Sequence, residues 1–327
     1  MIIDCEYYSD SSRISNSAIG WFLKKGPRYF RDMLDGKEEG LSGKFLEKGT
    51  MIHMYLLQPE EFWDNYIILE YEVPTVSQQK VLCASYVYEK QVMPLEDEDK
   101  LLLISYNKAY KNSKSDDKKI AEAKEIVKKY DSFIKAMSKE DNKTPITFAD
   151  LNMLKNIKKN IDEHKKASEL LTDIPGCDCE NEFHINWEDP KYGLPCKSLL
   201  DRRIIDTVNK KITLIDLKTT SDVRNFKHSV EEYDYYRQMT FYLLALTWYM
   251  KDQGIDVSDY DCEVYIIAIQ TNGNNEVRVF NMMNEDEIMD RKDLIFSALS
   301  ELSYHYQTGN WDHSRSYYEG DGTERLE

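Results

Sequence analysis

Two carboxylates and an amine within residues 199–220 have the side-chain types that phosphodiester hydrolysis requires. Asp201 lies in one apolar run, and Asp216 and Lys218 are two residues apart in the next. Two carboxylates suit a hard cation such as Mg²⁺, which takes one or two protein carboxylates and keeps several waters. A lysine beside that ion can orient or deprotonate a bound water, or neutralise a phosphate. Together, these residue types can carry out metal-assisted hydrolysis of a phosphodiester.

Two β-strands are expected to position these side chains. Residues 199–206 and 212–220 are apolar runs rich in β-branched residues, and the polar stretch 207–211 between them predicts a β-hairpin. Side chains at positions i and i+2 of a strand share a face, so Asp216 and Lys218 point the same way. The first strand can then place Asp201 beside them. A surface salt bridge is the alternative, because isolated Asp-x-Lys triplets are common by chance.

A helix follows this hairpin and carries a polar pair. Residues 231–246 have helical periodicity, with acidic residues at the start, where they favour the helix dipole. Gln238 and Tyr242 are four residues apart and therefore lie on one face of the helix. We expect that face to pack beside the carboxylates. A core tyrosine with a satisfied glutamine is the alternative for this pair.

Combined, these positions resemble the PD-(D/E)xK nuclease superfamily. The closer similarity is to the branch that holds the RecB-type nuclease domain and the RecE-type (exodeoxyribonuclease VIII-like) exonucleases of phages and prophages. The positions that carry it are Asp201, the segment Asp216-Leu217-Lys218-Thr219-Thr220, Gln238 and Tyr242. An upstream stretch, Gly49-Thr50-Met51-Ile52-His53 followed by Pro59-Glu60-Glu61-Phe62, is similar to the histidine segment of the RecE-type proteins. The resemblance covers roughly residues 12–62 and 146–300.

The resemblance implies a fold and a set of metal ligands. The fold is an α/β (α+β) restriction-endonuclease-like core, in which helices flank a central mixed sheet, with a helical insertion. The expected ligands of one or two Mg²⁺ or Mn²⁺ ions are His53, Glu182, Asp201 and Asp216, and the alternative for His53 is a hydrogen bond to a ligand of the metal. Glu182 is chosen because the RecE-type pattern has a glutamate five residues before a strand tryptophan, here Trp187. Glu180, on the same strand face, is the alternative third carboxylate.

The resemblance also assigns roles around the expected metal. Lys218 orients the attacking water, and Gln238 and Tyr242 position the phosphate or hold Lys218. The chain departs from the pattern at Leu199, where RecE-like sequences often have a basic residue. If that residue touches phosphate in those proteins, Lys197 or Arg202 would have to serve instead.

The chain is expected to form a single nuclease domain over residues 1–327. Its expected parts are N-terminal helices with the histidine motif (12–62), a helical insertion (84–171), the catalytic sheet with its flanking helices (177–307) and an acidic tail (308–327).

Charge and cysteine usage constrain the partners and the compartment. The net charge is −16, whereas a DNA-binding protein is expected to carry a basic footprint. Residues 251–327 hold 6 Lys/Arg and 17 Asp/Glu, a local charge of −11, so the acidic excess is remote in sequence from the expected site. The six cysteines have no metal-site or disulfide spacing, which indicates reduced thiols in a cytoplasmic protein. No apolar run approaches about 20 residues, so no transmembrane helix is expected.

By resemblance, the chain would be a metal-dependent DNA exonuclease that degrades duplex ends, 5′ to 3′, in phage-type recombination. A ring-shaped homo-oligomer, a single-strand annealing protein or recombinase as partner, and the cytoplasm of a bacterial host cell complete this expectation. An endonuclease with the same site is one alternative. A non-catalytic DNA-binding or assembly protein with a nuclease-like fold is another.

Overall fold

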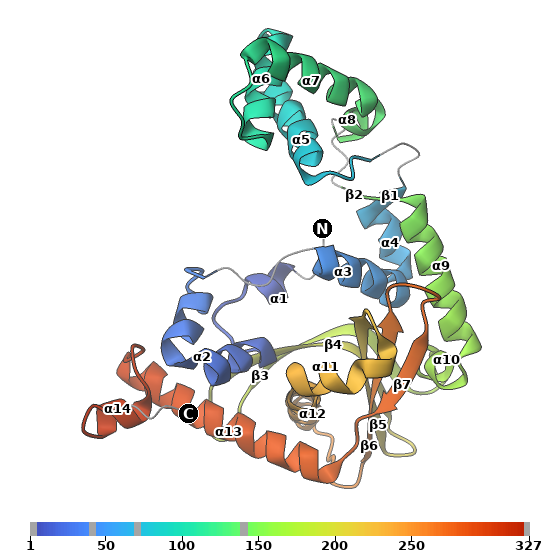
Figure 1. Ribbon diagram of the computed structural model, residues 1–327. Coiled ribbons are helices and arrows are strands. Elements are labelled where there is room, and N and C mark those ends of the chain that lie inside the picture. The colour runs from blue at the N-terminus through green and yellow to red at the C-terminus, as the bar shows by residue number, and fades with distance from the viewer. Residues whose placement is uncertain (1–4, 39–43, 69–72, 138–142, 324–327) are drawn as a thin grey trace. The chain divides into compact units, whose positions relative to one another are not determined.

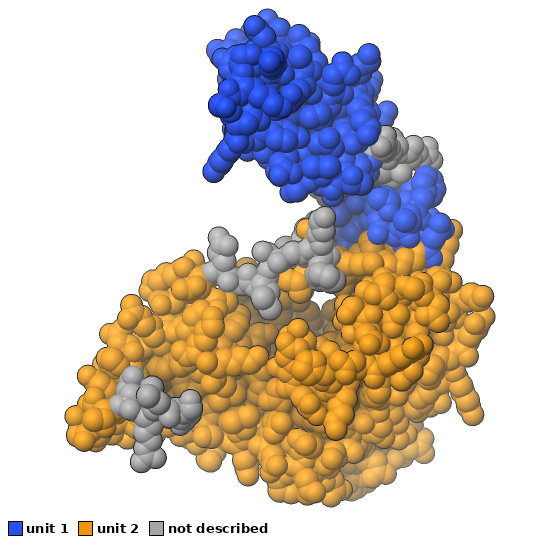
Figure 2. All heavy atoms as spheres, viewed as in Figure 1, with its two compact units in different colours: residues 1, 60–152 blue, residues 2–59, 153–327 orange. Residues whose placement is uncertain are grey.

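The computed structural model describes residues 5–38, 44–68, 73–137 and 143–323 (Figure 1). The chain divides into two compact units (Figure 2). Unit 1 is formed mainly by Glu60–Asn152, and unit 2 comprises Ile2–Pro59 and Met153–Glu327. All the residues expected to form the site belong to unit 2.

Unit 2 is built on a five-stranded mixed sheet with the order β3-β4-β5-β6-β7. The strands are β3 (Asp178–Glu188), β4 (Pro195–Asp206), β5 (Lys211–Thr220), β6 (Asp261–Gln270) and β7 (Val277–Asn281). Strands β5 and β6 are parallel, and the other neighbours are antiparallel. The middle of each central strand is buried, at Ile212–Leu217 of β5 and Val264–Ile269 of β6, as in strands that are covered on both faces. The expected α/β fold with a central mixed sheet flanked by helices is confirmed.

The helices of unit 2 pack on this sheet or on one another. They are α1 (Cys5–Ser9), α2 (Asn16–Leu34), α3 (Lys44–Leu57), α10 (Lys165–Leu171), the 3₁₀ helix η1 (Val223–Asn225), α11 (Phe226–Glu232), α12 (Tyr235–Asp252), α13 (Glu285–Thr308) and α14 (Arg315–Glu319). Parallel strands need a crossover connection, and η1, α11 and α12 supply it between β5 and β6. Helix α12 packs on β3 and β4, α2 and α13 pack on α12, and α3 contacts β4 and β5. The polar pair of α12 is thereby brought to the sheet.

Unit 1 has a core of its own. Helices α5 (Ser77–Val92), α6 (Glu98–Ala109), α7 (Asp116–Lys129) and α8 (Asp131–Met137) enclose buried side chains that include Leu82, Tyr86, Leu102, Tyr106 and Phe133. Before α5 and after α8, strands β1 (Tyr66–Ile68) and β2 (Thr144–Ile146) pair in parallel.

Two helices contain residues of both units, namely α4 (Pro59–Asn65) and α9 (Phe148–Glu163). Unit 1 overlaps the predicted insertion 84–171 but has different boundaries. The predicted tail 308–327 contains α14, and its last four residues, 324–327, lie outside the described residues. Compactness does not show independent folding, so the predicted division into domains stays a prediction. Across the described ranges, none of the helices combines the length and the apolar character that membrane crossing demands.

Candidate metal centre

The candidate site lies where strands β4 and β5 separate. Their pairing runs from Asp206↔Lys211 to Arg202↔Ile215 and ends there. Asp201 and Asp216 are the next residues along each strand, while β5 continues to pair with β6 as far as Thr220. The backbone N–H of Leu217 donates to Oδ2 of Asp201 over 2.7 Å, so the carboxylate takes the place of a main-chain acceptor. Two carboxylates on neighbouring strands are thus held at the opening between the strands.

Glu182 stands opposite Asp201 on the other neighbour, β3. The β3–β4 pairs include Asn181↔Arg202 and Phe183↔Leu200, and the intervening position, Glu182 against Asp201, is left out of the ladder. Glu182 has a φ of 49°, a left-handed conformation that residues other than glycine rarely adopt. Its backbone therefore departs from the extended strand at the position opposite the candidate ligand Asp201.

The left-handed residue also changes the alternation of side chains along β3. The Arg203 guanidinium lies 3.9 Å from the centroid of the Phe183 ring, and its Nη2 donates to Oε2 of Glu180 over 2.7 Å. Glu180 and Phe183 are three residues apart and would lie on opposite faces of a regular strand. Glu180 is therefore paired with the buried Arg203, and the strand-face argument that made it the alternative third carboxylate does not hold.

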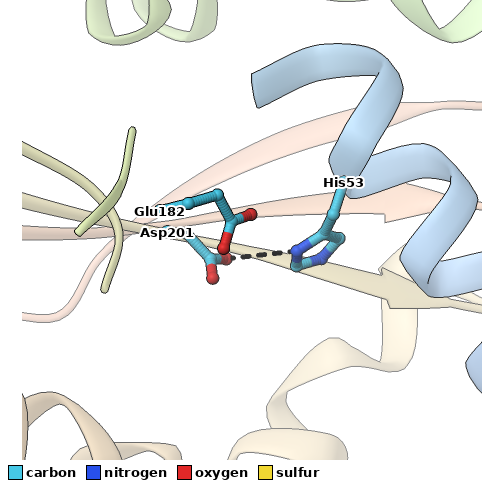
Figure 3. Close-up of side chains that lie close together, drawn as sticks. All are labelled: His53, Glu182 and Asp201. Carbon is cyan, nitrogen blue, oxygen red and sulfur yellow. Dashed lines mark ion pairs between the residues drawn. The ribbon is translucent and has the colours of Figure 1, made fainter. Parts of the chain in front are cut away.

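Helix α3 supplies the histidine. It meets the sheet at Gly49, where a Cβ atom would lie 3.4 Å from Oγ1 of Thr219 on β5. One turn later, Nδ1 of His53 lies 3.6 Å from Oδ2 of Asp201. The ligand atoms of His53, Glu182 and Asp201 all lie within 4.8 Å of one another (Figure 3). The structure thus brings together three of the four predicted metal ligands.

The protonation state of His53 suits a ligand. Burial lowers the pKa of the imidazole to about 4, and the ammonium of Lys218 acts in the same direction. The ring is therefore neutral at neutral pH and has a lone pair for a metal ion, as a histidine ligand must. Burial also raises the pKa of Asp201, because the carboxylate is removed from water.

Asp216, the fourth predicted ligand, lies beside this group in an ion pair with Lys218. The Asp216 side chain is 1% exposed and that of Lys218 is 18% exposed. Burial raises the pKa of Asp216 to about 6, against the influence of Lys218 and with a contribution from the charge of Asp201. Burial lowers the pKa of Lys218, but Asp216 and Asp201 outweigh it, so that pKa is raised.

A divalent cation fits this arrangement. Glu182, Asp201 and Asp216 bring three carboxylates to the site, and Lys218 pairs with Asp216. Removing carboxylates from water is costly, and a bound divalent cation offsets that cost. Carboxylate oxygens with one imidazole nitrogen form a ligand set that Mn²⁺ accepts, and the oxygens are what Mg²⁺ prefers.

The polar pair of α12 reaches the site through Asp216. Nε2 of Gln238 donates to Oδ1 of Asp216 over 3.3 Å and to the hydroxyl of Tyr242 over 2.9 Å. Burial raises the pKa of Tyr242 well above its usual value, so the phenol is neutral. The expectation that these two residues hold Lys218 is replaced by a contact with its carboxylate partner. Their contact with a phosphate stays a prediction.

The two basic residues proposed to compensate for Leu199 are used inside the fold. Nζ of Lys197, 7% exposed, donates to the backbone carbonyls of Tyr7 and Asp10. Arg202, 2% exposed, donates from Nε to the carbonyl of Leu170 and from Nη1 and Nη2 to neighbouring side chains. The expectation that Lys197 or Arg202 serves a phosphate is therefore wrong, because burial and these hydrogen bonds commit both side chains.

Sequence reasoning missed one aromatic neighbour of the site. Nζ of Lys218 lies 5.2 Å from the centroid of the Tyr235 ring, within the range of a cation–π interaction. Tyr235 is the first residue of α12, and it belongs to the run Tyr233-Asp234-Tyr235-Tyr236. That aromatic run directly before the Gln238 turn was the available signal.

We expect Mn²⁺ or Mg²⁺ to raise the melting temperature of the wild-type protein and EDTA to reverse the rise, because an ion that binds only the folded state stabilises it. His53→Ala should abolish most of this response. His228→Ala, which removes a side chain that is 68% exposed, is the matched control and should respond like wild type. Differential scanning calorimetry with and without the metal checks both expectations. An unchanged response in His53→Ala would remove this residue from the ligand set.

At position 182, a glycine variant should be more stable than an alanine variant, which is the reverse of the usual order of stability in a strand. Alanine in a left-handed conformation is strained by about 1 kcal/mol, whereas glycine adopts it freely. In EDTA, Glu182→Gly should therefore be more stable than Glu182→Ala by roughly that amount, as denaturant unfolding would measure. Glu188, exposed at the end of β3, should show the ordinary order, with alanine the more stable. The ordinary order at Glu182 as well would contradict the assigned backbone conformation.

Comparison with known proteins identifies a structural neighbour. No protein-family model matches the sequence, and no curated protein matches it. A crystal structure of a protein named "Putative exonuclease", from Eubacterium rectale, is similar with a TM-score of 0.52 and 10% sequence identity. The similarity covers 100% of this chain and 96% of that chain. At this identity, the comparison shows that the two proteins share a fold.

Proposed function

We propose that this protein is a metal-dependent nuclease that hydrolyses phosphodiester bonds. The supporting observation is the convergence of His53, Glu182 and Asp201, with ligand atoms within 4.8 Å of one another, beside the buried pair Asp216 and Lys218. The fold shared with a protein named as an exonuclease supports the same class of reaction.

Each side chain has a role in this proposal. His53, Glu182, Asp201 and Asp216 hold Mg²⁺ or Mn²⁺. When bound, the ion supplies Lewis-acid stabilisation of the phosphate and a lowered pKa of water. The ammonium of Lys218 orients the attacking water and stabilises negative charge that builds up on the phosphate during the reaction. Gln238, held by Tyr242, keeps the carboxylate of Asp216 in place for the ion and for Lys218.

The finer proposal is an exonuclease of the PD-(D/E)xK type that is RecE-like. Its substrate would be the end of a DNA duplex, degraded 5′ to 3′ during phage-type recombination in the cytoplasm of a bacterial host. The protein would assemble into a homo-oligomeric ring. Its partner would be a single-strand annealing protein or a recombinase. The sequence motifs support this reading, and the name of the structural neighbour supports an exonuclease.

Removing either member of the buried ion pair should abolish most of the activity. Asp216→Asn and Lys218→Ala should each lower kcat at least ~10²-fold on DNA in Mg²⁺, because Asp216 holds the ion and Lys218 stabilises negative charge on the reacting phosphate. Asp312→Asn and Lys227→Ala, whose native side chains are 73% and 90% exposed, are the matched controls and should retain wild-type rates. Initial rates of nucleotide release from labelled DNA measure the effect. Wild-type rates in both ion-pair variants would refute the proposed roles.

The topology of the DNA separates an exonuclease from an endonuclease with the same site. An exonuclease needs an end, so a linear duplex should be degraded in Mg²⁺ while a covalently closed circle stays intact. Gel electrophoresis of both substrates in one reaction gives the result. Cleavage of the circle would favour the endonuclease. DNA binding that EDTA leaves unchanged, without cleavage of either substrate, would favour a non-catalytic DNA-binding protein.

A further inference from the structure

An aromatic stack runs from the surface into the core beside the candidate metal centre. The rings of Tyr233 and Tyr235 have centroids 5.8 Å apart and an interplanar angle of 24°. Tyr235 and Phe226 follow at 5.8 Å and 30°, and Phe226 and Phe280 at 5.1 Å and 18°. These are offset, nearly parallel arrangements, which aromatic rings favour. Phe226 is 1% exposed, whereas Tyr233 at the outer end of the stack is 51% exposed.

The outer end of this stack lines a cleft that includes the last residues of β5. Tyr233 and Tyr235 line a cleft of about 390 Å³, together with Thr219 and Thr220, which follow Lys218 on β5. Nζ of Lys218 faces the Tyr235 ring, so the cleft and the candidate metal centre are adjacent. This volume lies within the range of small-ligand sites, roughly 300–1,000 Å³, and suits one nucleotide.

Polar groups line the same cleft. Lys48 of α3 lines it, and its ammonium donates to the carbonyl of Thr271 over 2.8 Å, which uses one of three donors. Two acidic side chains, Asp222 and Glu232, also line the cleft. The Asp222 carboxylate accepts from the backbone N–H of Arg224 over 2.9 Å, and Glu232 lies 3.7 Å from His228. The ammonium of Lys48 in the cleft and that of Lys218, beside the Tyr235 ring, favour an anionic phosphate, and the exposed Tyr233 ring favours an aromatic group.

We propose that this cleft holds the nucleotide next to the scissile phosphodiester, with its base unpaired and stacked on Tyr233. The proposal rests on the nuclease function above and narrows the substrate to a strand whose base at this position has left the duplex. A base would extend the four-ring stack by one ring. Every base has an aromatic face, so this contact tolerates any sequence. Duplex ends would then have to fray before hydrolysis.

The stacking can be observed directly with the intact protein. A single-stranded oligonucleotide with 2-aminopurine at its terminal nucleotide loses fluorescence when that base stacks on an aromatic ring. The titration uses Ca²⁺ in place of Mg²⁺ to suppress hydrolysis of the oligonucleotide. Wild type and Tyr233→Phe should quench the probe, and their Kd values should agree within about twofold. Tyr233→Leu should quench little and bind roughly tenfold more weakly, the scale of one base–aromatic contact.

Two controls separate stacking from damage to the fold. Tyr88→Leu removes another exposed tyrosine, 57% exposed in unit 1, and should leave quenching unchanged. An abasic terminal nucleotide tests the wild-type protein without any mutation. The kcat/KM of the wild-type protein should be roughly tenfold lower on the abasic substrate than on the intact one. For Tyr233→Leu the two substrates should give the same kcat/KM, because the mutation and the missing base remove the same contact. Full quenching by Tyr233→Leu would overturn the assignment. Equal rates of hydrolysis of the abasic and the intact substrate by the wild-type protein would overturn it as well.

The outcomes for this cleft and for the nuclease proposal are distinguishable. Quenching that depends on Tyr233, without hydrolysis in Mg²⁺, would support the base site and refute the nuclease function. Hydrolysis that depends on Asp216 but not on Tyr233 or on the terminal base would support the nuclease and refute the base site.

Discussion

The separation of β4 from β5 after Arg202 and Ile215 is the constraint on which the candidate site depends. In a continued antiparallel pair, Asp201 and Asp216 would stand directly opposite, and like charges at that position destabilise a sheet. The chain instead gives the Leu217 N–H to the Asp201 carboxylate. The ladder loses pairing at this point, and the opening that results is where two strands and helix α3 present their ligands to one small volume.

A second opposition on the other side of β4 reinforces this opening. Glu182 leaves the β3 ladder in a left-handed conformation opposite Asp201, so the ligand strand is released from regular pairing on both sides at the same residue. Such strained residues persist where the surroundings hold them, and they cluster at functional sites. Lys218 and Gln238 then restrain the remaining carboxylate, Asp216, from β5 and α12. The local balance of charge at this opening, rather than the net charge of −16, decides what the site can bind.

Local periodicity was sufficient to predict one part of this arrangement, and long-range packing determined the rest. Asp216 with Lys218 and Gln238 with Tyr242 follow from spacings of two on a strand and four on a helix. The backbone conformation of Glu182 does not follow from spacing, because it departs from the alternation that sequence reasoning assumes. The commitment of Lys197 and Arg202 depends on carbonyl groups from remote segments, which composition cannot reveal. Likewise, the boundary of unit 1 falls inside the continuous helix α9, where the sequence has no turn signal.

The parallel pairing of β1 with β2 brings together the two ends of the helical segment α5–α8 within unit 1. Helices α5 to α8 lie between β1 and β2 in the sequence. The two strands are paired, and paired strands lie only about 4.8 Å apart, so the helical segment begins and ends at nearly the same place. The entropic cost of bringing the two ends of an inserted segment together rises only slowly with the length of the segment. Helical modules of quite different size could therefore be exchanged at this junction during evolution, or grafted there by design, while the sheet that holds the carboxylates keeps its own connectivity.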